Sequence, residues 1–286
     1  MKVKIGYIQL AASTNQEENF LRTVDKIEKL AQKGTQIICT QELFLSPYFC
    51  NEESKKHFDL AKPIPNQETN ILAKLAKELN IVIIASFFEK TDDQKHYNTT
   101  ILFDTEGKTN KYRKTHIPYD PDYYEKYYFE KGDLGYQVFN TKHGKIAPLI
   151  CFDQWFPEAA RAVALKGAQL IVYPTAIGWD KNDTIETQKE ELSAWKTIQQ
   201  AHAIANGVYI MSVNRVGNEK NTQFWGNSFI SNPFGKIVQQ ARETEEVNFY
   251  EIDYEKISTY RKTWAFLRDR RPETYNSISQ TDNDDL

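Results

Sequence analysis

The sequence contains few cysteines, and their spacing excludes two common roles. Among its 286 residues there are only three, Cys39, Cys50 and Cys151. An odd number without a short repeated spacing excludes a disulfide framework and a cysteine-based zinc site. No cluster of metal ligands and no phosphate-binding loop occurs, so we expect no cofactor. We also expect a reducing, cytoplasmic environment, in which a thiol stays free to react.

The chain also lacks long apolar runs, basic blocks and flexible linkers. No apolar run approaches the roughly 18 residues of a membrane-spanning helix, and we expect no signal peptide. The formal net charge is −3, and without a basic block nucleic acid is not expected as a partner. Because no linker divides it, we predict a single domain over residues 1–286, with a carboxy-terminal extension from about 254 and a solvated tail, Ser277 to Leu286.

Apolar periodicity predicts helices and strands that alternate in two similar halves. Two facing sheets with helices outside would bury the apolar faces of both halves. The predicted helices cover residues 16–32, 66–79, 157–166 and 185–205. The predicted strands cover residues 3–9, 36–41, 81–89, 97–104, 108–113, 136–140, 145–150, 169–173, 207–213, 224–231, 236–240 and 246–252.

The most informative position is Cys151, which follows a predicted buried strand at 145–150. A predicted helix begins nearby at Pro157, a position where a proline loses no hydrogen bond. A thiol between a strand and a helix lies near free backbone N–H groups. Such groups would lower the thiol pKa and could bind an oxyanion. By residue type alone, however, a cysteine in this setting is more often a buried structural residue.

Two further polar residues stand at the ends of predicted strands. Glu42 follows the strand 36–41, and Lys114 follows the strand 108–113. In α/β proteins, residues at the carboxyl ends of strands face the ligand, so both could reach the site of Cys151. Alone, each would be interpreted as a solvated residue. Together with Cys151 they favour a nucleophile, a proton shuttle and a cationic oxyanion site.

The order of these motifs resembles that of the nitrilase superfamily of carbon–nitrogen hydrolases. The resemblance covers nearly the whole chain and implies an α/β fold, the four-layer α-β-β-α sandwich of the nitrilase type. Phe152 stands where the family usually has tryptophan. The residues that carry the resemblance are Gln41-Glu42, Tyr112-Arg113-Lys114-Thr115-His116 and Ile150-Cys151-Phe152-Asp153-Gln154-Trp155-Phe156-Pro157-Glu158.

The resemblance also implies roles for individual residues. Cys151 would be the nucleophile, Glu42 would move the protons, and Lys114 with the backbone N–H of Phe152 would hold the oxyanion. A second glutamate, Glu125, would orient the lysine and the substrate, although the nearby Asp122 leaves the register open. His116 is expected to support Lys114.

A homo-oligomer, a dimer or larger, is implied as well. Its contact surfaces are expected to be the helix 157–166 and the segment Trp264 to Pro272, because relatives extend this tail across a subunit interface. The apolar side chains of Trp264, Phe266 and Leu267 have little core of their own in this polar, basic region.

Other segments, Tyr173 to Gly178 and Phe266 to Pro272, resemble the branch of the superfamily that acts on a carbamoylated diamine. This resemblance implies cleavage of N-carbamoylputrescine to putrescine, ammonia and carbon dioxide, in a route from agmatine. The distal ammonium of that substrate needs a carboxylate. Asp180 is the first choice, followed by Asp183 and Glu186. The residues predicted to contact the rest of the substrate are Tyr48, Tyr123 and Trp155.

Other functions stay open at this stage. An N-carbamoyl amino acid or β-ureidopropionate would need an arginine for its carboxylate, and none occurs between Arg161 and Arg215. An ω-amidase is a further alternative. A non-catalytic scaffold would not need Glu42, Lys114 and Cys151 together. An amide-transfer domain would need a second domain to receive ammonia.

Overall fold

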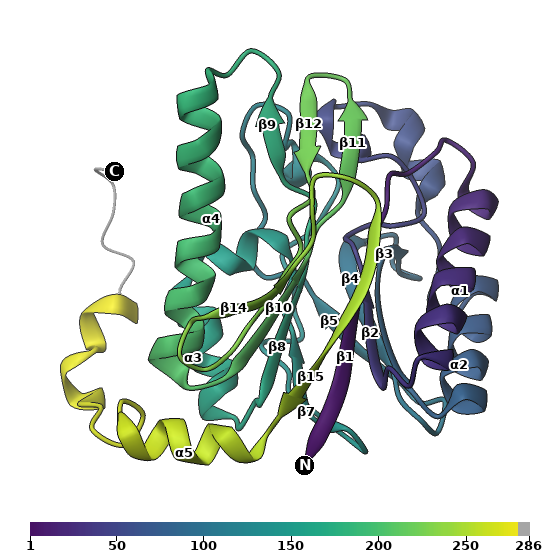
Figure 1. Ribbon diagram of the computed structural model, residues 1–286. Coiled ribbons are helices and arrows are strands. Elements are labelled where there is room, and N and C mark those ends of the chain that lie inside the picture. Colours follow the sequence, from purple (N-terminus) through teal and green to yellow (C-terminus); the bar gives the residue numbers. More distant parts are fainter. Residues whose placement is uncertain (280–286) are drawn as a thin grey trace.

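Two six-stranded sheets face each other in the computed structural model, which describes residues 1–279 (Figure 1). The first has the order β15-β1-β2-β3-β4-β5, with bounds β1 Lys2–Gln9, β2 Ile37–Thr40, β3 Val82–Lys90, β4 His96–Phe103, β5 Thr109–Arg113 and β15 Glu246–Asp253. The second has the order β14-β13-β10-β8-β7-β6, with bounds β6 Phe139–Thr141, β7 Gly144–Pro148, β8 Leu170–Pro174, β10 Tyr209–Val213, β13 Phe229–Ser231 and β14 Ile237–Gln240.

Alternation of side chains along the strands decides which layer each residue joins. Inward-facing residues of both sheets form one buried cluster, which includes Ile5, Val82, Val172 and Met211. Their outward-facing neighbours pack under helices, because successive side chains of a strand point to opposite faces. The helices are α1 (Gln16–Gln32) and α2 (Gln67–Leu79) over the first sheet, and α3 (Pro157–Leu165) and α4 (Ile185–Asn206) over the second (Figure 1). The predicted four-layer sandwich is confirmed.

Local sequence explains where these helices begin and end. The side chain of Asn15 accepts a hydrogen bond from the backbone of Glu18 and caps α1. Asn66 and Thr69 cap α2 reciprocally. Gly207, in the left-handed conformation, ends α4. Because each of these signals is local, the predicted bounds of the four helices are correct to within one residue.

Three predictions are wrong where the chain leaves the main sheets. The predicted strand 224–231 is two strands, because Gly226 and Asn227 have φ of +59° and +55° and turn the chain. The first of them, β12 (Thr222–Trp225), joins β11 (Val216–Glu219) and β9 (Gly178–Asp180) in a small third sheet. Neither β11 nor β9 is predicted, and the predicted strand 136–140 begins late, as β6.

After β15 the chain forms a further helix, α5 (Glu255–Thr263), which the sequence does not predict. The prediction of a solvated tail from Ser277 to Leu286 falls mostly outside the described residues. Within residues 1–279, no helix combines the length and the apolar character needed to cross a membrane.

The strand arrangement brings together residues that are far apart in the sequence. Strands β2 and β8 lie in different sheets, yet the backbone N–H of Glu42, after β2, donates to the carbonyl of Thr175, after β8, at 3.4 Å. The segments following β5 and β7 reach the same end of the sandwich. This end is where the candidate residues meet.

Candidate active site

Cys151 lies at the start of a short 3₁₀ turn, Cys151–Trp155, between β7 and α3. Its φ is +41°, in the left-handed region, which costs a non-glycine residue about 1–3 kcal/mol and persists only where surrounding contacts impose it. One such contact is the bond from the backbone N–H of Ile150 to Oδ2 of Asp153, at 3.0 Å. Asp153 therefore fixes the turn that presents the thiol.

Asp153 also ties this turn to the segment that carries Lys114. Its Oδ2 accepts a hydrogen bond from the Tyr112 hydroxyl at 2.7 Å, and its Oδ1 lies 2.7 Å from Nδ1 of His116. The ring of His116 stacks on Phe156 with centroids 3.6 Å apart. His116 thus supports the lysine segment, as the sequence predicts, and Asp153 is a supporting residue that sequence reasoning did not single out.

Lys114 lies fully buried between two glutamates. Its Nζ is 2.9 Å from Oε1 of Glu42, and 2.8 and 2.6 Å from the two carboxylate oxygens of Glu125. All three side chains are fully inaccessible to solvent. A buried ammonium is tolerated only when it is paired, and here two carboxylates share it. The register question is thereby answered, since Glu125 and not Asp122 contacts the lysine.

The two oxygens of Glu42 differ in their surroundings. Oε1 accepts hydrogen bonds from Lys114 and from the side-chain amide of Asn98, at 2.7 Å. Oε2 is buried and has no partner among residues 1–279. A buried acceptor without a donor is costly and therefore rare. This oxygen is available to take a proton from a thiol or a water molecule.

The pKa of the Cys151 thiol is raised, whereas the sequence predicts that it is lowered. Burial and the carboxylates of Glu42 and Glu125 raise it well above its ordinary value, and the opposing effect of Lys114 does not compensate. The thiol is therefore protonated at rest, and its hydrogen points to the carbonyl of Ala176, with the sulfur 3.8 Å from that oxygen. A thiol in this state needs a base at the moment of attack.

The same carboxylates act on Lys114 and on each other. Burial opposes the charge of Lys114, but Glu125 and Glu42 outweigh it and raise the pKa of the ammonium well above its ordinary value. Burial raises the pKa of the Glu125 carboxyl, as does Glu42, whereas Lys114 and a hydrogen bond from Tyr48 lower it. The lysine thus stays charged throughout the accessible pH range.

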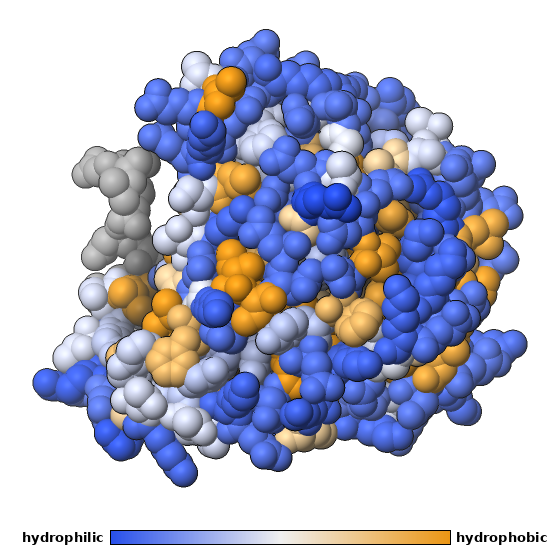
Figure 2. Space-filling model, in the orientation of Figure 1, coloured by the Kyte–Doolittle hydropathy of each residue, from blue (hydrophilic) through white to orange (hydrophobic). Residues whose placement is uncertain are grey.

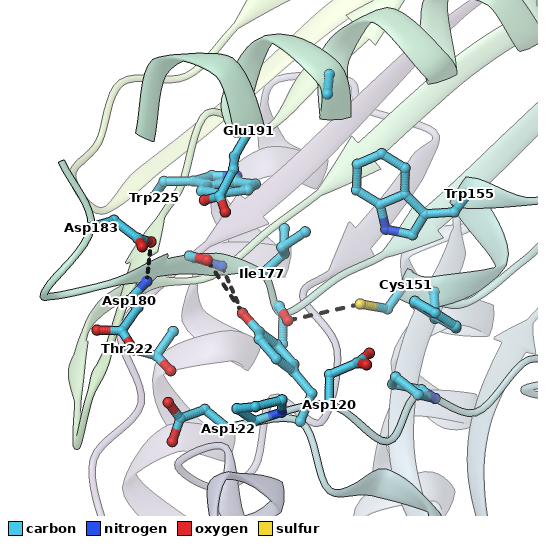
Figure 3. A pocket seen from close by; sticks show the side chains of 17 residues that line it. Asp120, Asp122, Cys151, Trp155, Ile177, Asp180, Asp183, Glu191, Thr222 and Trp225 are labelled. Atoms are coloured by element: carbon cyan, nitrogen blue, oxygen red, sulfur yellow. Dashed lines mark hydrogen bonds between the residues drawn. The ribbon is translucent and has the colours of Figure 1, made fainter. Parts of the chain in front are cut away.

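A cavity of about 460 Å³ opens above Cys151 (Figure 3). Its aromatic walls are Phe152, Trp155, Trp225 and Tyr123. The hydroxyl of Tyr123 accepts a hydrogen bond from the backbone N–H of Gly178 at 3.1 Å. Every charged side chain that lines it is acidic: Asp120, Asp122, Asp180, Asp183 and Glu191. The cavity can therefore hold a small molecule with an apolar middle and a cationic end.

Most of the predicted substrate contacts line this cavity, but not all. Asp180, Asp183, Tyr123 and Trp155 do. Glu186 does not line it, and neither does Tyr48, whose buried hydroxyl donates to Oε1 of Glu125 at 2.6 Å instead. Tyr48 is thus placed to hold a glutamate rather than a substrate.

Sequence reasoning also missed Asn98 and Glu191. A signal for Glu191 was present, because it precedes the buried Trp195 by one helical turn; although exposed, it lies on the side of α4 that lines the cavity. No comparable signal marks Asn98, whose role depends on the pairing of β3 with β4. Within residues 1–279, no three His, Cys, Asp or Glu side chains are grouped to bind a metal ion.

A sandwich that brings a cysteine, a glutamate and a lysine together at one end defines the class of the protein as a cysteine-dependent hydrolase. A family model for carbon–nitrogen hydrolases matches residues 4–262. The chain belongs to the carbon–nitrogen hydrolase family.

Individual relatives resemble the chain over nearly their whole length. An N-carbamoylputrescine amidase of Solanum lycopersicum is 41% identical, covering 98% of this chain and 96% of that protein. A citrullinase of Francisella tularensis subsp. tularensis is 40% identical, covering 96% and 98%. The crystal structure of a carbon–nitrogen hydrolase from Helicobacter pylori G27 matches with a TM-score of 0.95 at 38% identity, covering 98% of this chain and 99% of that chain.

Replacing Glu42 by glutamine should separate turnover from thiol ionisation. Turnover should fall about a hundredfold to ten-thousandfold, the usual contribution of a positioned base. Because the Glu42 carboxylate raises the pKa of Cys151, its loss should move the pH midpoint of alkylation by iodoacetamide to lower pH. Mass spectrometry of labelled peptides measures that midpoint, with Cys151→Ala as the unlabelled, inactive control. Unchanged turnover, or a midpoint that moves to higher pH, would contradict the arrangement.

Tyr48→Phe tests whether this hydroxyl serves Glu125 or the substrate. The hydrogen bond from Tyr48 lowers the pKa of the Glu125 carboxyl, so its removal should raise that pKa further. We expect the acid limb of the kcat profile to move to higher pH and kcat to fall about tenfold, the effect of losing a hydrogen bond to a charged group. KM should stay unchanged. A rise in KM with an unaltered kcat profile would instead support the substrate contact that the sequence predicts.

Proposed function

We propose that the protein hydrolyses the ureido group of N-carbamoylputrescine, releasing putrescine, ammonia and carbon dioxide. Such a reaction belongs to the biosynthesis of the polyamine putrescine. The name of the Solanum lycopersicum relative supports this substrate, and so does the acidic cavity above Cys151. The three free cysteines agree with a cytoplasmic location, which we propose with it.

In the proposed reaction, Glu42 takes the thiol proton through its free Oε2 as the sulfur of Cys151 attacks the ureido carbon. Lys114, together with the backbone N–H of Phe152, stabilises the oxyanion, and a single donor of this kind is typically worth about 3 kcal/mol. The tetrahedral intermediate collapses when Glu42 returns the proton to the departing nitrogen. Water, activated by the same carboxylate, then cleaves the resulting S-thiocarbamate and restores the thiol. The carbamic acid that is released decomposes to carbon dioxide and the second nitrogen product.

Glu125 has a positioning role in this proposal. Its two oxygens both accept hydrogen bonds from the ammonium of Lys114, in addition to the one that Glu42 accepts. The lysine would otherwise be free to turn away from the developing oxyanion. Net consumption of one water molecule per ureido group balances the release of one amine, one ammonia and one carbon dioxide.

The single observation that carries the choice of substrate is the sign of the charges in the cavity. Its lining contains five carboxylates and no lysine, arginine or histidine. An ammonium at the distal end of the substrate would meet opposite charge and the faces of tryptophan rings. Asp180, the residue favoured by the sequence, is one of these five carboxylates.

The citrullinase relative makes citrulline the second candidate. Citrulline carries the same ureido group, but its far end bears a carboxylate beside the ammonium. That carboxylate would enter an acidic cavity without a positive partner, which is unfavourable by Coulomb repulsion. The same argument disfavours N-carbamoyl-β-alanine.

A panel of substrates with ammonia release as the readout tests this proposal. We expect kcat/KM for N-carbamoylputrescine to exceed that for citrulline and N-carbamoyl-β-alanine by at least about a hundredfold, a difference of about 3 kcal/mol. An ω-amide such as α-ketoglutaramate belongs in the same panel. Faster turnover of any carboxylate-bearing compound would move the assignment to that substrate class.

We further propose that the protein is a homo-oligomer, at least a dimer. Apolar side chains are exposed on α3 and on the segment after α5, among them Leu165, Trp264 and Phe266. Figure 2 shows several separate apolar patches on this mainly hydrophilic face, some of them on its left side, where Figure 1 places the chain after α5. A second copy of the chain would cover such residues and brace the helix behind Cys151.

Light scattering at micromolar concentration should therefore report a dimer or a larger assembly. Leu165 is 46% exposed, and a second copy of the chain would cover it. Leu165→Lys should shift the distribution toward monomer, because the introduced ammonium would then be buried in the interface. Leu21→Lys is the matched control, since Leu21 is 58% exposed on α1, on the opposite side of the sandwich. A monomeric wild-type protein would refute the proposal, and equal effects of both variants would refute the assigned surface.

A further inference from the structure

Glu191 reaches the cavity from a different element than Asp180. It lies in the second turn of α4, whereas Asp180 ends β9. In Figure 3 its side chain points from α4 toward the cavity beside Trp225, at the end away from Cys151 and Trp155. Asp120 lies nearer the thiol in the same view. Glu191 therefore faces the place where the distal end of a bound substrate would lie.

The carboxylates of Asp180 and Asp183 are already engaged in the turn that links β9 to α4. Oδ1 of Asp180 accepts hydrogen bonds from the backbone and the side-chain amide of Asn182, at 2.8 and 2.9 Å. Oδ2 of Asp183 accepts one from the backbone N–H of Asp180, at 3.0 Å. These hydrogen bonds hold both side chains within the turn and partly compensate the negative charge of each carboxylate.

Glu191 has no such compensation among the described residues. Partial burial, Asp183 and Asp180 all raise the pKa of its carboxyl, and no donor opposes them. A carboxylate in this setting gains more from an incoming cation than one that is already hydrogen-bonded. The adjacent Trp225 offers an indole face to the same cation.

We propose that Glu191 is the specificity-determining residue that binds the distal ammonium of the carbamoylated amine. The assignment rests on the proposed function and refines it, because it transfers the main ion pair from Asp180 to α4. The assignment also explains why a substrate whose far end carries both an ammonium and a carboxylate would bind less well. A carboxylate beside the ammonium, as in citrulline, would approach Glu191 and Asp183 from within the cavity.

Three compounds separate binding of the far end from the chemistry at the ureido group. N-carbamoylputrescine carries the terminal ammonium, N-butylurea has the same length of chain without it, and citrulline adds a carboxylate. For Glu191→Gln we expect kcat/KM for N-carbamoylputrescine to fall at least about tenfold, through KM. Activity on N-butylurea should change by less than about twofold, because the neutral chain makes no ion pair. The ratio of kcat/KM for citrulline to kcat/KM for N-carbamoylputrescine should rise in this variant.

The chain offers a matched control in the preceding residue. Glu190 is exposed like Glu191 but does not line the cavity, so Glu190→Gln removes the same charge without touching the site. It should leave all three substrates unaffected. Glu191→Asp keeps the charge on a shorter side chain and should recover part of the lost affinity. Alkylation of Cys151 by iodoacetamide at the wild-type rate verifies that each variant retains its active site.

The possible outcomes distinguish this assignment from the proposed function. A wild-type enzyme without preference for N-carbamoylputrescine over N-butylurea would overturn both. A wild-type preference that survives Glu191→Gln but is lost in Asp180→Asn would overturn the assignment to Glu191 alone and return it to Asp180. An equal loss in Glu190→Gln would also overturn it, because the effect would then come from overall charge.

Discussion

The ion pair between Lys114 and two glutamates is the constraint on which the rest of the site depends. One buried ammonium is shared by two buried carboxylates, and burial raises the pKa of one of them, Glu125, to about 7. The two glutamates keep the lysine protonated, and burial together with these glutamates raises the pKa of the Cys151 thiol and keeps it neutral. In the proposed reaction the thiolate therefore forms as Glu42 accepts the thiol proton.

The two sheets make this arrangement rigid. Glu42, Lys114 and Cys151 follow strands from both halves of the chain, and each is held by bonds that cross between elements. Arg215 adds another, since its buried guanidinium donates to the carbonyls of Glu42, Leu43 and Ser46 at 3.1 Å. Because packed sheets cannot deform independently, the positions of the reacting groups are set by the whole core rather than by any one loop.

The floor and the walls of the cavity have separate tasks. Cys151 lines the floor, whereas Glu42 and Lys114 are fully buried outside the lining. The proposed chemistry of these three residues is common to small amides and ureides, which agrees with the variety of names among relatives of similar identity. The walls come from β9, from α4 and from the loop of Asp120 and Asp122. Charges on these walls select the substrate without touching the bond that is broken, so selectivity can differ among proteins that share one reaction centre.

The sequence by itself determined the four helices, most strands, the sandwich and the positions of Glu42, Lys114 and Cys151, because capping residues, apolar periodicity and local motifs are written in neighbouring residues. Tertiary structure alone decided the third sheet, the bond from Asn98 to Glu42 and the place of Tyr48 behind Glu125. It also decided that the pKa of the Cys151 thiol is raised, whereas the sequence predicts a lowered pKa. A local turn supplies backbone donors that favour a thiolate, but only the folded chain adds burial and two carboxylates that oppose it.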